Sequence, residues 1–201
     1  MREAFSANKC LVLPGLFDAE FVDCIVSRVD PRDFYQKVHV DRQLNEFSSD
    51  VTLRESEPAL HLLHFVMNNP ALFPIIERIT GCQKVAGFGG RIYCIVPEDG
   101  HHLEWHDDTE AGDRLVGISV NLGAGIFEGG MFQLREKMSH HLLAEVGNES
   151  PGDAHIFDID PKLEHRVTEI KGDAPRVAAA GWFLSKSAFF DRIRMTAPKR
   201  A

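Results

Sequence analysis

The sequence has few cysteines and no long apolar run. Its four cysteines, Cys10, Cys24, Cys82 and Cys94, are scattered over 201 residues and include no CxxC pair. This pattern argues against a disulfide framework or a zinc site and is typical of a reduced cytoplasmic protein. No apolar run approaches the roughly 20 residues that span a bilayer, and the N-terminus lacks the basic and then apolar pattern of a signal peptide. We therefore expect a cytoplasmic protein with no membrane partner.

Positive charge is scarce as well. The chain has 22 lysines and arginines against 30 aspartates and glutamates, for a formal net charge of −8. Because a phosphate backbone needs a basic surface, we expect no nucleic-acid partner. The basic residues Arg192, Arg194, Lys199 and Arg200 are predicted to lie in a solvated terminus. Charge and composition leave the oligomeric state open.

Helical patterns dominate the N-terminal part, residues 1–82. A short apolar strand is predicted at 10–14, whereas residues 33–55 are mixed and polar and take no firm assignment. Apolar residues recur at helical spacing in three segments, with Asp18 as a capping residue and Gly81 as a stop signal. The predicted helices cover residues 18–29, 58–68 and 71–80.

From Lys84 onward the sequence changes to short runs rich in Val, Ile, Phe and Tyr, separated by Gly, Pro and Asp. Such runs without long helices between them predict a β-sandwich or barrel. The runs lie near 84–96, 103–108, 115–122, 130–135, 141–146, 154–158, 164–170 and 176–184. We expect a single domain over 1–201, in which a helical part (1–82) covers one face of a β core (83–186) and a tail (187–201) follows.

The first candidate for chemistry is an H-x-D step, His106-Asp107-Asp108. Residues i and i+2 of an extended strand face the same side, so His106 and Asp108 would point together and Asp107 would point away. Glu104 also lies two residues from His106 and is an alternative carboxylate. Because H-x-D steps are common by chance, this one carries little weight alone.

Two further residues support the interpretation of the H-x-D step as part of a metal site. His165 follows 57 residues after Asp108, and Arg176 follows eleven residues after His165. Two imidazoles and one carboxylate on one face of a metal leave three positions open, which is the facial triad of non-haem Fe(II) oxygenases. Two of these positions can take a 2-oxo acid and one can take O₂, while the planar fork of an arginine suits the far carboxylate of that acid. His155 could replace His165, but the spacing to Arg176 favours His165, and we expect His155 to be an exposed residue of a neighbouring strand.

The combined motifs resemble the 2-oxoglutarate/Fe(II)-dependent dioxygenase superfamily, and within it the prolyl 4-hydroxylase-like group. The matching residues are His106-Asp107-Asp108, Phe127-Glu128-Gly129-Gly130, Gly152-Asp153-Ala154, His165-Arg166-Val167, and Arg176 followed by Gly181-Trp182-Phe183. The resemblance implies a mainly β fold, a double-stranded β-helix or jelly roll, with Fe(II) held by His106, Asp108 and His165. It also implies 2-oxoglutarate bound by Arg176, O₂ as a co-substrate, and ascorbate as a further candidate cofactor.

One position departs from the pattern of this group. Many relatives have Ser or Thr two residues after the arginine, where the hydroxyl helps to hold 2-oxoglutarate, whereas this chain has Ala178. Tyr93 resembles a tyrosine that some relatives direct at the 2-oxoglutarate carboxylate, with an aromatic of the core as the alternative interpretation. Thr168 is a weaker candidate hydroxyl. The Gly129-Gly130 pair predicts a turn with positive φ or a close backbone approach.

The predicted activity is hydroxylation of an unactivated C–H bond in a small molecule or an amino-acid side chain, with release of succinate and CO₂. Halogenases of the superfamily have Gly or Ala in place of the carboxylate, so Asp108 favours hydroxylation or a related oxidation. The alternatives are a non-catalytic jelly-roll protein, which has no need of an intact triad, and a cupin-like metal protein without a 2-oxo acid, which has no need of Arg176. Segments 33–55, 97–104 and 136–151 are predicted to select the substrate.

Overall fold

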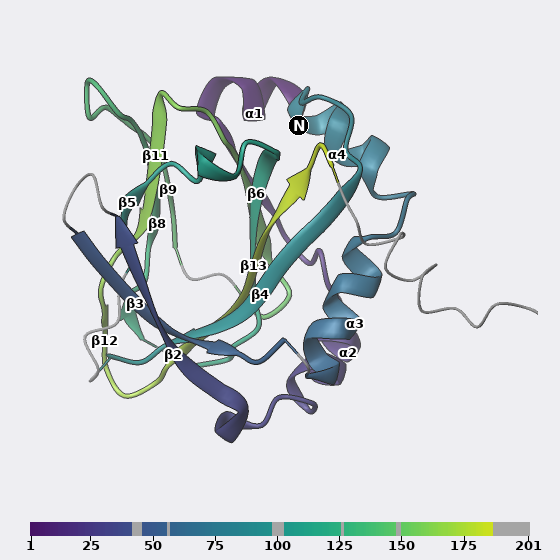
Figure 1. The fold of residues 1–201 in the computed structure, drawn as a ribbon, viewed down its shortest axis with the longest axis vertical. Helices are drawn as coiled ribbons and strands as arrows, with labels where there is room; N and C mark the ends of the chain where they lie inside the picture. The colour runs from purple at the N-terminus through teal and green to yellow at the C-terminus, as the bar shows by residue number, and fades with distance from the viewer. Residues whose placement is uncertain (42–45, 56, 98–102, 126, 148–149, 187–201) are drawn as a thin grey trace, which may run out of the picture.

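The computed structural model (Figure 1) describes residues 1–41, 46–55, 57–97, 103–125, 127–147 and 150–186, and between 36 and 50 it describes the backbone alone. The helices are α1 (Arg2–Asn8), α2 (Ala19–Val26), α3 (Pro58–Met67) and α4 (Phe73–Thr80), with short 3-10 turns η1 (Pro31–Asp33) and η3 (Thr109–Ala111). The strands are β1 (Cys10–Leu13), β2 (Phe34–Asp41), β3 (Glu46–Leu53), β4 (Gly87–Ile95), β5 (Leu103–His106), β6 (Arg114–Asn121), β7 (Glu128–Gly129), β8 (Phe132–Glu136), β9 (Leu142–Val146), β10 (Ala154–Asp158), β11 (Leu163–Val167), β12 (Ile170–Lys171) and β13 (Arg176–Leu184). The predicted tail 187–201, with its basic residues, lies outside the described residues.

Two antiparallel sheets face each other and form a double-stranded β-helix. The large sheet has seven strands in the order β1-β10-β6-β13-β4-β3-β2, and the small sheet has four in the order β5-β11-β8-β9. From β4 to β13 the chain passes back and forth between these two sheets, and the short strands β7 and β12 pair with each other. This arrangement confirms the predicted mainly β jelly roll.

Capping residues set the ends of the helices. Asp18 precedes α2, and its carboxylate accepts a hydrogen bond from the amide of Phe21 at 2.7 Å. Gly81 follows α4 in the left-handed conformation, with a φ of 76°. The three predicted helices are therefore present, with ends that differ from the prediction by a few residues. In the part of the chain that the structure describes, no helix is both long and apolar enough to cross a membrane.

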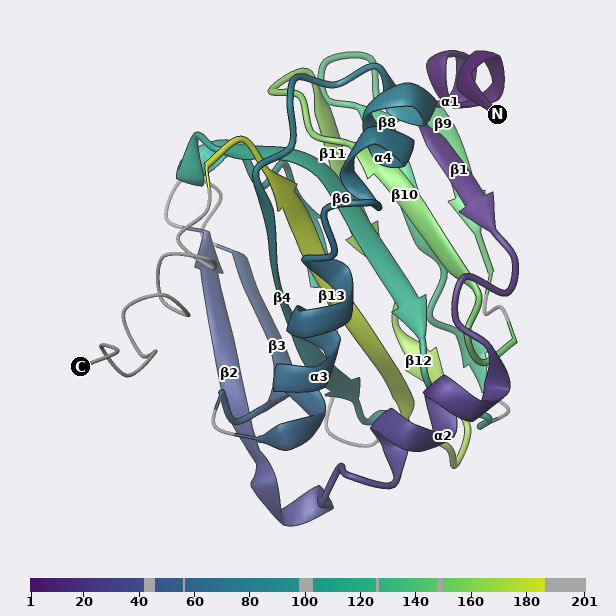
Figure 2. The ribbon, with the colours of Figure 1, turned by 90° about the vertical axis from the view of Figure 1, so that its right-hand side faces the viewer.

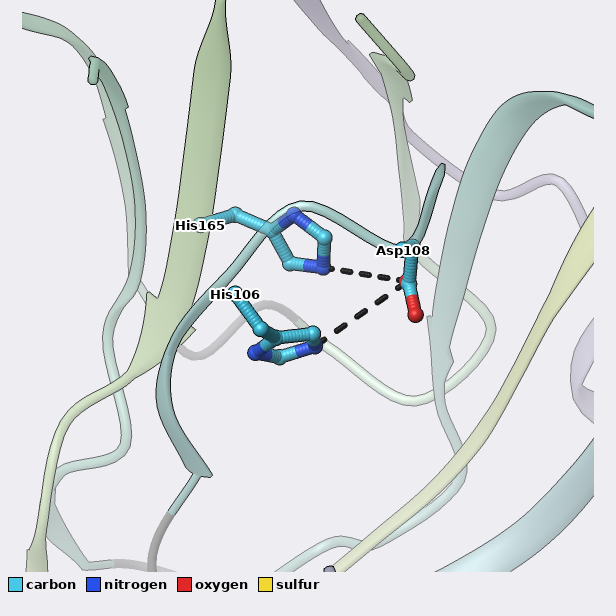
Figure 3. Close-up of side chains that lie close together, drawn as sticks. All are labelled: His106, Asp108 and His165. Carbon is cyan, nitrogen blue, oxygen red and sulfur yellow. Dashed lines mark ion pairs between the residues drawn. The ribbon is translucent and has the colours of Figure 1, made fainter. Parts of the chain in front are cut away.

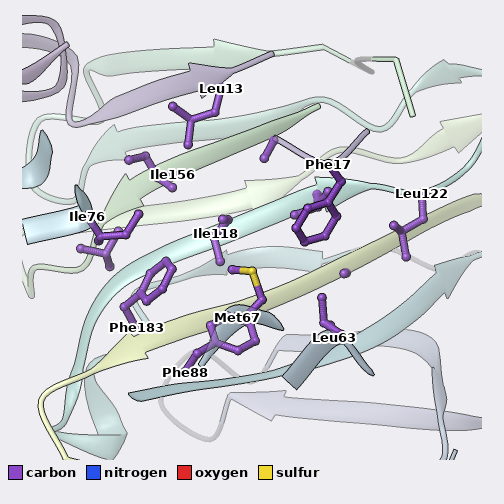
Figure 4. Close-up of a cluster of buried hydrophobic side chains, with 14 of the residues drawn as sticks. Leu13, Phe17, Leu63, Met67, Ile76, Phe88, Ile118, Leu122, Ile156 and Phe183 are labelled. Carbon is purple, nitrogen blue, oxygen red and sulfur yellow. The ribbon is translucent and has the colours of Figure 1, made fainter. Parts of the chain in front are cut away.

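Helices α2, α3 and α4 lie on the outer side of the large sheet, and α1 lies at the end of β1 (Figure 2); the main hydrophobic core fills the space between the helices and the sheet. There, Met67 of α3 and Ile76 of α4 belong to the same cluster as Phe183 of β13 (Figure 4). Side chains alternate along β13, so Phe183 faces the helices whereas Ala178 belongs to a cluster between the two sheets. The inner face of the large sheet is thus turned toward the small sheet.

The N-terminal part, residues 1–82, is not only helical. Residues 33–55, which the sequence leaves unassigned, contain the hairpin of β2 and β3, and β3 extends the large sheet by pairing Thr52 with Tyr93 of β4. The hairpin is stabilised by pairing with a strand that is distant in sequence. Its own residues are mixed and polar and therefore show no apolar periodicity that would predict two strands. The sequence pattern also fails to predict α1, because that helix buries Phe5 alone.

Candidate metal centre

Neighbouring strands of the small sheet bring His106 and His165 together. His106 is the last residue of β5, His165 lies on β11, and the two residues pair directly across the antiparallel strands. Directly opposed residues present their side chains on the same face, and the two ring centroids are 4.3 Å apart. The His165 side chain is 8% exposed and the His106 side chain 35%, so the pair is reached from the His106 side.

Asp108 joins the two histidines through a left-handed turn. Strand β5 ends at His106, and Asp108 has φ 60° and ψ 11°, a conformation that aspartate tolerates better than most residues. Its Oδ2 lies 3.3 Å from Nε2 of His165 and 4.0 Å from Nε2 of His106 (Figure 3). The extended geometry predicted for H-x-D is therefore wrong, yet the three side chains do meet, with potential ligand atoms within 4.8 Å of one another.

Hydrogen bonds orient the His106 ring and turn Asp107 away. Nδ1 of His106 lies 2.6 Å from the carbonyl oxygen of Glu104. Because a carbonyl oxygen only accepts, Nδ1 is the donor in this contact, and Nε2 is the ring nitrogen left to face the centre. Glu104 thus contributes its backbone, and its carboxylate is not part of the group of three. The carboxylate of Asp107 accepts from the Thr109 hydroxyl at 2.6 Å and pairs with Nζ of Lys137 at 2.9 Å.

Asp108 is held in its ionised form. Nη1 of Arg114 lies 2.6 Å from its Oδ1, and the indole Nε1 of Trp182 donates to its Oδ2 at 2.7 Å. The Arg114 guanidinium in turn stacks on the Trp182 ring, 3.7 Å from its centroid. Burial by itself raises the pKa of Asp108, but the hydrogen bond from His165 and the charges of His165, His106 and Arg114 outweigh it and hold that pKa well below its usual range. The carboxylate is therefore ready to bind a cation at neutral pH.

A second polar cluster surrounds Arg176 on β13. Arg176 is only 5% exposed; its Nη1 donates to the Tyr93 hydroxyl and its Nη2 lies 3.4 Å from Oγ of Ser119. Within the described ranges its side-chain partners are these two hydroxyls, and neither of them carries a charge. Because a buried charge without a counter-charge is costly, the cluster is suited to an anion.

Of the two candidate hydroxyls, the structure brings Tyr93 to Arg176 and leaves Thr168 elsewhere. Tyr93 is 2% exposed and lies opposite Ala178 across β4 and β13. The Thr168 hydroxyl accepts a hydrogen bond from the Met131 amide at 2.9 Å and is not among the residues that line the cavity described below.

One cavity connects the two clusters. It measures about 500 Å³ with its opening to solvent included. Its lining includes His106, Asp108, His165, Tyr93, Ser119, His155 and Trp182. Arg176 is not itself a lining residue, and it meets the cavity through the hydroxyls of Tyr93 and Ser119. A ligand in this cavity could reach both the three potential metal ligands and the hydroxyls that contact Arg176.

His155 is buried, so the expectation of an exposed side chain is wrong. It is 5% exposed, lies on β10 directly opposite Ser119 of β6, and lines the cavity. The physical reason is topological, because β10 is an interior strand of the large sheet between β1 and β6. A histidine inside the apolar run Ala154–Phe157 is the sequence signal that could have indicated burial.

Sequence reasoning misses Ser119 as a site residue, and it gives Trp182, which it names as part of the family pattern, no role at the site. Ser119 is the one hydroxyl residue in the apolar strand β6, which is a signal of an inward polar position. Trp182 lies an even number of positions after Arg176 on β13, so both side chains leave the strand on the same face. Neither signal identifies the residue that each side chain contacts, because these contacts depend on which strands pair.

Glycines allow two close approaches around the cavity. Gly129 and Gly130 have φ of 78° and 63°, and a Cβ on Gly129 would lie 2.0 Å from the carbonyl oxygen of Glu169. This confirms the predicted turn. A Cβ on Gly117 would lie 2.1 Å from the ring of Phe157, and that ring packs against His165 with centroids 4.5 Å apart. The missing side chain at Gly117 thus helps to position His165.

Comparison with protein families gives a match over the part of the chain that contains these site residues. Residues 90–184 match the model of the 2OG-Fe(II) oxygenase superfamily, and this range contains the triad, Tyr93, Ser119 and Arg176. A search of curated proteins gives no match.

Solved structures share the fold at low sequence identity. An oxidoreductase of the 2OG-Fe(II) oxygenase family from Burkholderia pseudomallei is 13% identical, with a TM-score of 0.69 over 92% of this chain and 90% of that one. A Pseudomonas putida prolyl-4-hydroxylase is 16% identical, with a TM-score of 0.62 over 91% and 88%. A Trichoplax adhaerens prolyl hydroxylase, solved with a peptide of hypoxia inducible factor, is 12% identical, with a TM-score of 0.66 over 98% and 90%. These structures confirm the predicted fold, and the family model agrees with the resemblance to the superfamily over residues 90–184.

Proposed function

Because residues 90–184 match the model of the 2OG-Fe(II) oxygenase superfamily, we propose that this protein is an Fe(II)- and 2-oxoglutarate-dependent dioxygenase. It hydroxylates an unactivated C–H bond of a small molecule or an amino-acid side chain and releases succinate and CO₂. The observation that carries the proposal is the meeting of His106, Asp108 and His165 in the same cavity as the hydroxyls that contact the buried Arg176.

The donor set fits Fe(II). Two imidazoles and one ionised carboxylate supply three ligands on one face, and an octahedral ion then keeps three positions for a co-substrate and O₂. Bound iron would supply the activation of O₂, while the chain supplies the geometry. Glu104, through its carbonyl, orients His106, and Arg114 and Trp182 fix the two oxygens of Asp108. Ligands held in this way need little reorganisation when the metal binds.

The Arg176 cluster fits the distal carboxylate of 2-oxoglutarate. Its one positive charge has uncharged hydroxyl partners in the described part of the chain, and a carboxylate would neutralise it. Ser119 and Tyr93 supply the hydroxyls that Ala178 cannot. The 2-oxo acid end would then lie toward the triad, across the same cavity. This arrangement distinguishes a 2-oxo diacid from a 2-oxo monoacid.

The substrate is a small molecule or an amino-acid side chain that enters where the cavity opens to solvent. The hairpin of β2 and β3 lies beside this region, because Thr52 of β3 pairs with Tyr93. The Thr52 hydroxyl also accepts a hydrogen bond at 2.9 Å from Arg91, which lines the cavity. The predicted substrate segment 33–55 contains this hairpin. Residues 42–45 of this segment, and residues 98–102 and 148–149 of the other two segments, lie outside the described residues. The cytoplasmic location and the use of ascorbate stay predictions.

The test compares two neighbouring aspartates. Asp108→Asn removes a proposed ligand, and Asp107→Asn is the matched control in the same turn. We expect the wild type and D107N to bind one Fe(II) per chain and to form succinate from 2-oxoglutarate with iron and O₂, in a screen of amino acids and peptides. We expect D108N to lose Fe(II) affinity by about 100-fold or more and to form no succinate.

Three results would contradict the proposal. If the wild type binds no 2-oxoglutarate anaerobically and forms no succinate, the enzyme assignment fails in favour of a non-catalytic jelly roll. Metal binding without any effect of 2-oxoglutarate would indicate a cupin-like metal protein. Equal loss in D107N and D108N would indicate a general structural effect of the turn.

A further inference from the structure

His155 has a buried nitrogen without a partner. In the part of the chain that the structure describes, its Nε2 is the one buried side-chain polar atom that makes no hydrogen bond. The side chain lines the cavity between the triad and the Arg176 cluster. Since buried polar groups in proteins are nearly always hydrogen-bonded, an orphaned nitrogen on a side chain that lines a cavity points to a ligand of that cavity.

The His155 ring is fixed in place by its neighbours. It packs against Phe132 of the small sheet, with ring centroids 4.4 Å apart and an interplanar angle of 38°. Phe157, two residues along β10, lies with its ring centroid 6.2 Å away. The backbone of His155 is paired on both sides, with Val12 of β1 and Ser119 of β6. Such packing presents Nε2 in one orientation instead of letting the ring turn toward solvent.

Ser119 links His155 to the anion-binding end of the cavity. It lies directly opposite His155 across β10 and β6, and its hydroxyl is 3.4 Å from Nη2 of Arg176. Burial, and then the positive charges of Arg176 and His165, lower the pKa of His155 to about 3. His155 is therefore a neutral imidazole, so it can donate a hydrogen bond without adding a second positive charge to the one that Arg176 supplies.

Resting on the proposed function, we propose that His155 binds the co-substrate by donating a hydrogen bond from Nε2 to the distal carboxylate of a 2-oxo diacid, beside Arg176. The carboxylate then has one charged partner, Arg176, and neutral donors around it. His155 contributes to selectivity for a diacid, because a 2-oxo monoacid has no group to receive this hydrogen bond. The position is suited to this role because β13, which carries Arg176 and pairs with the other edge of β6, has Ala178 and no hydroxyl residue.

The test measures binding without turnover. Fe(II)-loaded wild type, His155→Leu and His155→Gln are titrated anaerobically with 2-oxoglutarate and with pyruvate, which lacks the distal carboxylate, and the visible absorption of the complex gives each Kd. A hydrogen bond to a charged group corresponds to about a 10- to 100-fold effect. We expect H155L to lose that factor for 2-oxoglutarate and nothing for pyruvate. H155Q keeps a donor and should recover most of the loss.

A matched histidine serves as the control. His64 of α3 makes a hydrogen bond with the Gly90 carbonyl oxygen at 2.8 Å and does not line the cavity. We expect H64L to lower the melting temperature and leave both Kd values unchanged, whereas metal-free H155L should melt no lower than the wild type at neutral pH, because it removes an unsatisfied polar atom.

The failures are distinguishable. If the wild type binds 2-oxoglutarate and H155L binds it equally well, the role of His155 is refuted and the proposed function stands. If H155L weakens both acids equally, His155 is structural and the inference is wrong. If the wild type binds neither acid, the proposed function itself fails and the inference fails with it.

Discussion

Acid should destabilise this protein through His155, by an amount that follows from its burial. Burial and the charges of Arg176 and His165 lower the pKa of its imidazole from 6.5 to about 3. In the unfolded chain the imidazole regains its ordinary pKa of 6.5, so between pH 3 and 6.5 the unfolded state binds more protons than the folded state. Stability therefore falls as the pH falls through this window. Each pH unit below 6.5 costs about 1.4 kcal/mol.

At pH 5 the penalty from His155 is about 2 kcal/mol, which corresponds to a fall of about 4–8 °C in melting temperature for a chain of this size. The assay is thermal unfolding of the metal-free protein, followed by circular dichroism at pH 7.5 and pH 5. The same measurement on His155→Leu serves as the reference, because this variant lacks the His155 imidazole and keeps the other side chains. We expect the wild type to lose about 2 kcal/mol more than H155L between these two pH values.

Asp108 does not interfere with this comparison. Its pKa is lowered in the folded state, so its contribution to stability is complete above its unfolded pKa and is lost only at lower pH than the experiment uses. If the wild type and H155L lose equal stability between pH 7.5 and pH 5, then His155 is protonated in the folded protein, and the reasoning from its burial is refuted.

Three further results are expected. Trp182→Phe removes the 2.7 Å hydrogen bond to Asp108 and should weaken Fe(II) binding, measured by anaerobic titration, about 10- to 100-fold. The control is Trp105→Phe, at a residue outside the cavity lining, which should leave Fe(II) binding unchanged. Equal Fe(II) affinities of the two variants would contradict this prediction. Gly117→Ala places a Cβ 2.1 Å from the ring of Phe157 and should cost about 1–3 kcal/mol in urea unfolding; an unchanged midpoint would refute it. Fe(II) at about 100 times its Kd should raise the free energy of unfolding by about 2.7 kcal/mol, and chelation should reverse the gain; no change on chelation would argue against a metal in the folded state.

The sequence predicts much of the fold because local patterns repeat in the β core. Short runs bounded by turn residues identify most strands, and Asp18 and Gly81 identify helix ends. The hairpin of β2 and β3 escapes prediction because its stability comes from pairing with a strand distant in sequence. Pairing of that kind leaves no periodic signal in the residues themselves.

The sequence predicts which residues form the site, but it does not predict the backbone conformation and the contacts that bring them together. The spacing of His106, Asp108, His165 and Arg176 identifies the groups that the structure brings to one cavity or its edge. The left-handed backbone of Asp108 could not be predicted, because a turn conformation depends on the contacts that hold it. Likewise, strand periodicity gives the face on which a side chain lies but not the residues opposite it, as for His155.

The most direct test of the account is a crystal structure obtained anaerobically with Fe(II) and 2-oxoglutarate. We predict one iron bound by His106, Asp108 and His165, with the 2-oxo acid end on the metal and the distal carboxylate at Arg176 and Ser119. Iron bound by other residues, or 2-oxoglutarate with its distal carboxylate away from Arg176, would contradict the account.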